Sequence, residues 1–145
     1  MRLLLLHVDY IEYAVTKATK HAETVADSSK QGRMEEALVA FVAAERRDEE
    51  AMDAVAQDAA DAIRNIATKV ATARVVLYPY AHLSSDLSTP ENAIEMLKKI
   101  EHLLVEYDVL RAPFGWYKSF TLKCKGHPLS ELSRTIKPEQ NQIRG

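Results

Sequence analysis

The pattern of hydrophobic and polar residues along the chain predicts five strands. Apolar or alternating runs of strand length cover residues 2–8, 37–45, 74–80, 114–125 and 133–137. The first run, RLLLLHV, is too continuously apolar for a strand with one face in water, so it predicts a buried strand that continues in extended form over residues 9–15. The second run fits a helix or a strand, and its valines and phenylalanine favour a strand. The third must end near Pro79, because proline cannot donate a hydrogen bond within a sheet.

Two other stretches have the three-and-four spacing of apolar residues that is typical of a helix lying on a sheet. In residues 48–72 this stripe consists of Met52, Val55, Ala59, Ile63, Ile66 and Val70. The second helix begins after Thr89, a suitable N-cap that is followed by Pro90, and its stripe runs from Ala93 to Tyr107. Each helix needs a sheet to cover its apolar stripe.

The order of these elements predicts the fold class. It is β-β-α-β-α-β, followed by a short helix that has Glu131 in its first turn and by an edge strand. Residues 16–33 are polar and rich in turn-forming residues, so they predict a surface loop, with a helix over residues 18–26 as the alternative. We therefore expect an α+β fold, with mostly antiparallel strands and two main amphipathic helices against one face of the sheet. The length of 145 residues, without linker or repeat, fits a single domain over residues 1–145.

The composition excludes several classes of protein. No apolar run approaches the ~20 residues of a membrane span. Asp9 and Glu12 interrupt the N-terminal apolar run too early for a signal peptide. The one cysteine, Cys124, excludes an internal disulfide and fits a reducing compartment. We therefore expect a cytoplasmic protein without a membrane partner.

Charge is distributed unevenly along the chain. Residues 1–110 hold 12 Lys/Arg and 19 Asp/Glu, a net charge of −7, whereas residues 111–145 hold 7 and 2, a net charge of +5. A positive C-terminal third steers a phosphate-bearing partner toward it. A solvated strand face and a basic tail explain the same charge without any partner.

Lys118 occupies a position where the strand pattern requires a hydrophobic residue. Side chains two apart share a face of a strand, so Lys118 lies on the same face as Trp116 and Phe120. A buried ammonium must be paired, reach a cavity or lose its proton, because an unpaired buried charge is very costly. A buried stem with its head in water at the strand end is the alternative. Together with His127 and Glu131 shortly after it, Lys118 indicates a polar site at one end of this strand.

His82 is the second candidate for chemistry. It follows the strand of residues 74–80 directly, on a loop of the kind that commonly carries sites, although a structural hydrogen bond explains it equally. His7 is expected to be a satisfied core residue, and His21 and His102 lie at surface positions. Scattered histidines do not provide the clustered ligands of a zinc site, and the chain has no P-loop, G-x-G-x-x-G or G-x-S-x-G motif. We therefore expect no metal and no cofactor.

Five stretches of the chain together resemble a known family. LLLHVDYIEY, GRMEEALVAF, VLYPYAHLSS, APFGWYKSF and CKGHPLSELSR look like the N-terminal editing domain of archaeal threonyl-tRNA synthetase, in the same order and spacing from residue 2 to about residue 137. The combination of the last three is specific. Val8 stands where the family can have a small polar residue, and Trp116 where it can have a tyrosine. None of the synthetase's aminoacylation or anticodon-binding parts is present.

The resemblance implies a hydrolase that removes serine wrongly attached to threonine tRNA. The family is similar in fold to the D-aminoacyl-tRNA deacylases and shares their ability to remove D-amino acids. Its members form homodimers, and the 2′-hydroxyl of the terminal adenosine helps to activate or position water. The implied partners are the 3′ end of tRNA(Thr) carrying serine, a second copy, and the remainder of threonyl-tRNA synthetase in cis or in trans.

The resemblance also implies which residues lie near the scissile ester. Carried over by motif position, the catalytic side chains are those of Lys118, His82, Glu131 and Tyr117. The residues expected to line the substrate pocket are Pro79, Ala81, Phe114 and Ala44. An aminoacyl ester is already activated, so hydrolysis needs a placed water and stabilisation of the oxyanion rather than a strong nucleophile. We expect Lys118, with Glu131 as its partner, to stabilise that charge, and His82 to orient the adenosine or the water.

Three alternatives stay open at this point. The first is a free-standing D-aminoacyl-tRNA deacylase, which performs the same ester chemistry with selection by chirality. The second is a non-catalytic module that binds tRNA or dimerises a synthetase, although such a module has no need of Lys118 on an apolar face beside Glu131. The third is an enzyme that acts on a small molecule.

Overall fold

The computed structural model, which describes residues 1–138, is organised around one long strand, β1. The strands are β1 (Arg2–Ala18), β2 (Gln31–Ala43), β3 (Arg74–Pro79), β4 (Asp108–Arg111), β5 (Trp116–Cys124) and β6 (Glu131–Thr135). The helices are α1 (Met52–Lys69) and α2 (Pro90–Leu103), and short 3₁₀ turns occur at Asp27–Ser29 (η1), Arg46–Glu50 (η2) and Ala81–Leu83 (η3). The final residues of the predicted domain, 139–145, lie outside the described part of the chain.

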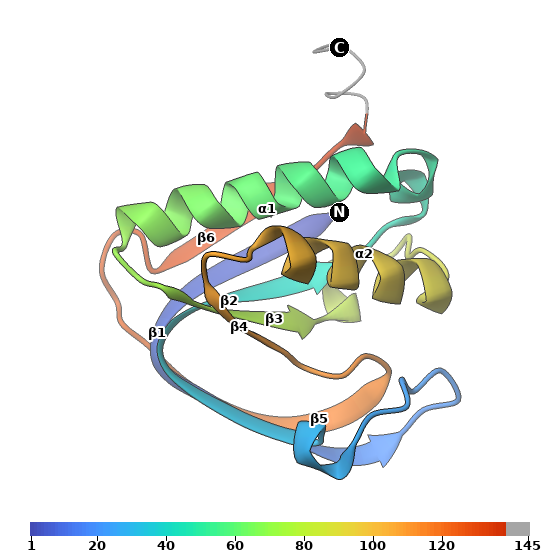
Figure 1. The fold of residues 1–145 in the computed structure, drawn as a ribbon, viewed down its shortest axis with the longest axis horizontal. Coiled ribbons are helices and arrows are strands. Elements are labelled where there is room, and N and C mark those ends of the chain that lie inside the picture. The colour runs from blue at the N-terminus through green and yellow to red at the C-terminus, as the bar shows by residue number, and fades with distance from the viewer. Residues whose placement is uncertain (139–145) are drawn as a thin grey trace.

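The strands form one mixed sheet in the order β4-β3-β2-β1-β5, with β6 also paired to β1. β1 is antiparallel to β2, β5 and β6, whereas β3 is parallel to both β2 and β4, as helical crossovers require. β1 changes its outer partner from β6 to β5 near Asp9, where the register with β5 shifts between Val8 and Tyr10. Figure 1 shows β1 and β2 curving strongly, so that β5 turns beneath the half of the sheet that contains β3.

Burial on both faces explains the continuous apolar run at the start of β1. Leu3 and Leu5 face the core beneath α1 and α2, while Leu4 and Leu6 pack against the core inside the curve of the sheet. At the border of this second core, the exposed side chain of Phe120 in β5 meets Tyr78 of β3 at a ring-centroid distance of 5.3 Å. This contact closes the curve of the sheet on itself.

Both predicted helices are present, with shorter bounds. α1 covers residues 52–69 of the predicted 48–72, and α2 ends at Leu103, before Tyr107. Val55, Ala59, Ile63 and Ile66 of α1 are all buried. In α2, the backbone N–H of Asn92 donates to the Thr89 hydroxyl at 3.3 Å, which confirms the predicted N-cap. Both helices cover the same face of the sheet, as Figure 1 shows, so the predicted α+β arrangement is confirmed. No helix of residues 1–138 is long and apolar enough to cross a membrane.

One predicted element is wrong, one has other bounds, and one strand was not predicted. The predicted loop covers residues 19–30, with a 3₁₀ turn at Asp27–Ser29 and no helix over residues 18–26, but both of its predicted ends belong to strands, because β1 extends to Ala18 and β2 begins at Gln31. These strand ends are half exposed and carry polar side chains, so the pattern of apolar residues did not predict a strand there. Glu131 does not begin a helix but opens β6, where it pairs with Leu6. β4, which pairs with β3, is a strand that the sequence pattern did not predict.

Candidate active site

The predicted substrate-binding residues meet at the open side of the curved sheet. Pro79 ends β3, Ala81 opens η3 two residues later, Ala44 follows β2, and Phe114 lies in the turn between β4 and β5. They line two adjoining hollows of about 240 and 400 Å³. Residues common to both walls are Thr19, Tyr80, Ala81, Phe114 and Gly115. The sequence therefore identified residues that the fold brings to one cavity.

The two hollows differ in character. The smaller one contains Ala44 and is lined mainly by apolar side chains, among them Val42, Leu87 and Ala93. The larger one contains three of the four predicted catalytic residues, His82, Tyr117 and Lys118. Three side chains capable of hydrogen bonding, those of His82, Tyr117 and Lys118, thus lie beside an apolar recess, an arrangement typical of a ligand site.

Lys118 reaches this cavity, and no carboxylate of residues 1–138 forms an ion pair with it. Its ammonium nitrogen donates to the Trp116 carbonyl oxygen at 3.1 Å and lies 5.0 Å from the centre of the Tyr78 ring. Burial lowers the pKa of Lys118 to about 8. Of the outcomes expected for a lysine on this strand face, the structure shows the one in which the half-buried ammonium reaches a cavity.

His82 and Tyr117 lie at the mouth of the cavity. His82 is exposed in η3, with its ring 5.1 Å from that of Tyr80 in an edge-on contact. The η3 turn is fixed by the Tyr80 N–H, which donates to the Val42 carbonyl at 2.8 Å. Tyr117 is 63% exposed and pairs with Lys17 of β1. Both side chains are placed to meet a ligand that enters from solvent.

Glu131 does not join this cavity, so the expected pairing of Lys118 with Glu131 is wrong within one chain. Glu131 pairs with Leu6 at one part of β1, and Lys118 pairs with Val15 at another. Nine residues of extended strand correspond to about 30 Å along the chain. The contact of the Glu131 carboxylate is with Cys124, whose thiol lies 3.7 Å from Oε1.

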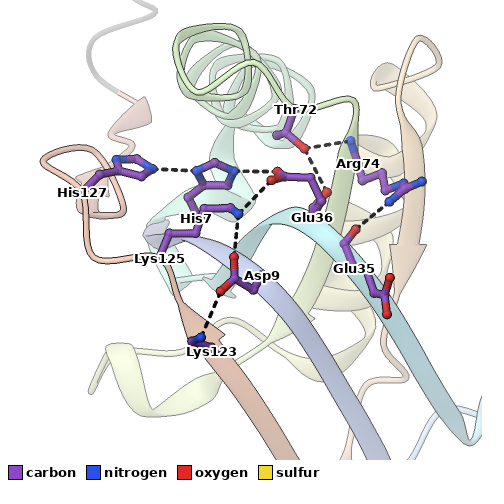
Figure 2. Close-up of polar contacts among 9 residues, drawn as sticks. All are labelled: His7, Asp9, Glu35, Glu36, Thr72, Arg74, Lys123, Lys125 and His127. Atoms are coloured by element: carbon purple, nitrogen blue, oxygen red, sulfur yellow. Dashed lines mark hydrogen bonds and ion pairs between the residues drawn. The ribbon is translucent and has the colours of Figure 1, made fainter.

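A second polar cluster lies where β1 changes partner, near the opposite end of β5 from Lys118 (Figure 2). His7 is buried, and its Nε2 lies 2.7 Å from Glu36 and its Nδ1 2.7 Å from His127 Nε2. Lys125 bridges Asp9 at 2.6 Å and Glu36 at 2.9 Å. The prediction that His7 is a satisfied core residue is confirmed. Within residues 1–138, no group of three or more His, Cys, Asp or Glu side chains is arranged to hold a metal ion.

Sequence reasoning missed one wall of the cavity. Thr19 and His21 line it, although residues 16–33 were expected to form only a surface loop. The signal that would have found this wall is Gly115, which has φ +82° and whose Cβ, if present, would lie 2.4 Å from the His21 carbonyl oxygen. A glycine within APFGWYK therefore marks a close approach of two backbones.

Comparison with known proteins agrees with this geometry. Residues 1–136 match the family described as the archaea-specific editing domain of threonyl-tRNA synthetase. The threonine–tRNA ligase of Methanothrix thermoacetophila is 52% identical over 144 residues, which cover 99% of this chain and 23% of that protein. The ligase of Methanosarcina acetivorans is 56% identical over 140 residues, 96% of this chain and 22% of that protein. The chain thus spans less than a quarter of the length of these relatives.

Solved structures share the fold at low identity. The c-Myc DNA unwinding element binding protein aligns with a TM-score of 0.62 at 10% identity, over 93% of this chain and 98% of that one. A probable eukaryotic D-amino acid tRNA deacylase aligns with a TM-score of 0.52 at 11% identity, over 92% and 98%. The predicted deacylase-like fold is therefore confirmed. The family match also confirms the predicted class of enzyme, an aminoacyl-tRNA hydrolase, because editing by a synthetase domain is hydrolysis of the aminoacyl ester. The chain belongs to the archaea-specific editing domains of threonyl-tRNA synthetase.

Proposed function

We propose that this domain hydrolyses the ester of L-seryl-tRNA(Thr). The observation that carries the proposal is the position of Lys118 in the hollow that adjoins an apolar recess. Its ammonium is half-buried and has no carboxylate partner among the described residues. Such a cation has its charge available for an anionic ligand or for an oxyanion that forms during a reaction. A module that only binds or dimerises does not require this arrangement.

The reaction needs little from the protein beyond placement and charge. Water attacks the carbonyl carbon, the carbonyl oxygen becomes an oxyanion, and the bond to the ribose oxygen then breaks as that oxygen takes a proton. Lys118 would donate a hydrogen bond to the oxyanion, a contribution typically worth ~2–4 kcal/mol. His82 would orient the terminal adenosine or the water at the cavity mouth. The 2′-hydroxyl of the adenosine would help to position the water, as the resemblance implies.

The apolar recess of about 240 Å³ is the proposed site of the amino acid side chain. Serine and threonine differ by one methyl, and an attractive pocket discriminates such a pair by only ~1–3 kcal/mol. We propose that threonine is spared because its additional methyl is excluded sterically or displaces the attacking water. Removal of D-amino acids is the second activity that the resemblance implies, and the same cavity would serve it.

We also propose which molecules this domain assembles with. The partners are the 3′ end of tRNA(Thr), the remainder of threonyl-tRNA synthetase in cis or in trans, and a second copy of this chain. A homodimer matters for chemistry, because Glu131 acts in editing only if a neighbouring copy brings it to the cavity. The cytoplasm, where tRNA is charged, is the compartment that this function implies.

The decisive experiment measures deacylation of L-seryl-tRNA(Thr) and L-threonyl-tRNA(Thr) in parallel, with D-seryl-tRNA as a third substrate. Loss of serine alone, reduced when the terminal adenosine lacks its 2′-hydroxyl, is the expected result. Hydrolysis of the D-ester alone would mean that the domain selects its substrate by chirality and does not remove L-serine. If none of the esters is cleaved, the domain is a binding module and the proposal is wrong.

A further inference from the structure

The wall formed by residues 19–23 is held against the turn at residues 114–116 by a network outside the predicted catalytic set. This wall contributes Thr19 and His21 to the cavity, and the turn contributes Phe114 and Gly115. Neither segment belongs to a helix or strand except at Trp116, the first residue of β5. Their relative position therefore depends on the contacts between them.

Hydrogen bonds to backbone carbonyl oxygens join the two segments. The Thr19 N–H donates to the Gly115 carbonyl at 3.0 Å, and the Thr19 hydroxyl donates to the same oxygen at 2.6 Å. The Glu23 N–H donates to the Phe114 carbonyl at 2.8 Å, and the indole N–H of Trp116 donates to the Glu23 carbonyl at 2.9 Å. Each end of the wall is thus tied to the turn.

The Glu23 side chain adds a charged link to this arrangement. Its two oxygens accept from the Arg111 guanidinium at 2.9 and 3.0 Å, and Oε1 also accepts from the Phe114 N–H at 3.1 Å. The side chains of Arg111 and Glu23 are only 15% and 10% exposed. Burial alone would raise the pKa of Glu23, but the hydrogen bonds from Arg111 and Phe114 outweigh it and lower that pKa. Such a bidentate fork between a guanidinium and a carboxylate fixes the relative orientation of the two side chains as well as their distance.

We propose that Glu23 is a positioning residue for ester hydrolysis in this cavity, an inference that rests on the proposed function. Through Arg111 at the end of β4 and through Phe114, it sets the separation of the two loops that enclose the amino acid. Glu23 itself is absent from the cavity lining, so it acts through Thr19, His21 and Phe114. Misplacement by about 1 Å costs an enzyme on the order of 100-fold in rate.

The chain offers a matched control for this role. Arg111 makes a second ion pair with Glu101 of α2 at 3.0 Å, and within the described residues no hydrogen bond or ion pair joins the Glu101 side chain to residues 19–23 or 114–116. Glu23→Gln and Glu101→Gln each remove one carboxylate from the same arginine. Arg111→Lys keeps the charge and removes the fork. The single tryptophan, Trp116, is bonded to the wall and reports its position by fluorescence.

The experiment measures single-turnover hydrolysis of seryl- and threonyl-tRNA(Thr), Trp116 emission and Tm for the wild type and these three variants. We expect Glu23→Gln and Arg111→Lys to lose about 10- to 100-fold in serine hydrolysis at saturating enzyme, with altered Trp116 emission and a changed serine-to-threonine ratio. Glu101→Gln should stay within about threefold of wild type with unchanged emission.

Two results would overturn the proposal. If Glu23→Gln, folded at the assay temperature, keeps the wild-type rate and ratio, then Glu23 serves only stability. The same holds if Glu23→Gln and Glu101→Gln lose equal activity in proportion to their loss of Tm. A wild-type protein that cleaves neither ester would instead refute the proposed function, and the role of Glu23 in hydrolysis would fall with it.

Discussion

The ammonium group of Lys118 lies 5.0 Å from the centre of the Tyr78 ring, and within the described part of the chain it donates to a carbonyl oxygen and pairs with no carboxylate. Burial raises the pKa of Tyr78, so this ring remains a neutral phenol. The face of an aromatic ring attracts a cation without neutralising it. The charge of Lys118 is therefore retained for a ligand rather than consumed in an ion pair.

Lys118→Met tests this use of the charge. Methionine keeps most of the apolar stem but cannot donate to an oxyanion, so we expect single-turnover deacylation of seryl-tRNA(Thr) to fall about 30- to 1,000-fold. The measurement is the rate at saturating enzyme, with circular dichroism as the control for folding. A rate within about threefold of wild type would remove Lys118 from the mechanism.

The rate advantage that Lys118 provides should depend on pH. Because burial lowers its pKa to about 8, the ammonium form is populated below that pH and is lost above it. We expect the ratio of wild-type to Lys118→Met rates to be constant near pH 6–7 and to fall toward about a tenth of that value one unit above the pKa. The rate of hydrolysis without enzyme is subtracted from both rates at each pH, because this background would by itself lower the ratio at high pH. A ratio that stays flat to pH 9.5 would contradict a role for the ammonium form.

The lowered pKa of Lys118 also predicts that its charge destabilises the fold, although the same charge favours catalysis. The pKa of Lys118 falls from 10.5, its ordinary value, to about 8 in the folded state, so between these values the unfolded chain binds more protons. The cost of burying the charge is therefore fully present below pH 8 and disappears as pH rises toward 10.5. At pH 7, Lys118→Met should raise Tm by roughly 2–4 °C, the effect of about 1 kcal/mol in a domain of similar size. This gain should vanish at pH 10.5; an equal gain at both pH values would point to apolar packing alone.

How much of the candidate site could be predicted depended on whether its residues left a local signal. Lys118 interrupted a period of two, and His82 followed a clear strand, so both could be named from the sequence, and the fold brings them to the same hollow. Glu23 and Arg111 are 88 positions apart in the sequence, and neither interrupts a strand or helix pattern or belongs to a motif. Their pairing follows from the curvature of β1 and β2, a long-range property that no local pattern encodes. The missed strand ends at Ala18 and Gln31 have the same origin, because pairing across the sheet overrode their polar composition.

The cluster at the bend of β1 makes a prediction about acid stability. Leu129 N–H donates to His127 Nδ1 at 3.1 Å, so the other nitrogen of His127 carries the proton and donates to His7, which in turn donates to Glu36. Burial raises the pKa of Glu36, but hydrogen bonds from Lys125 and His7 outweigh it, so the net pKa is lowered. This carboxylate thus stabilises the fold above its ordinary pKa of 4.5, and that contribution is lost as pH falls through the lowered value.

Glu36→Gln should therefore lower Tm at pH 7 and have a smaller effect at pH 3, as measured by thermal unfolding at both pH values. Glu35→Gln, which removes an exposed carboxylate from the preceding position of β2, is the matched control and should change Tm little at either pH. Should the Glu36→Gln deficit be as large at pH 3 as at pH 7, the ion pairs of Glu36 would not be its source of stability.

The separation of Glu131 from Lys118 leads to a prediction about assembly. If Glu131 acts on the cavity of a second copy, a mixed dimer of Lys118→Met and Glu131→Gln has one cavity with both defects and one with neither. Equimolar mixing of the two inactive variants after dissociation should then restore about a quarter of wild-type seryl-tRNA(Thr) hydrolysis, since about half of the dimers are mixed and each has one intact cavity. If Glu131 acts within its own chain, every cavity keeps one defect and mixing restores nothing. A Glu131→Gln protein as active as wild type would show instead that Glu131, held beside Cys124, has no part in the reaction.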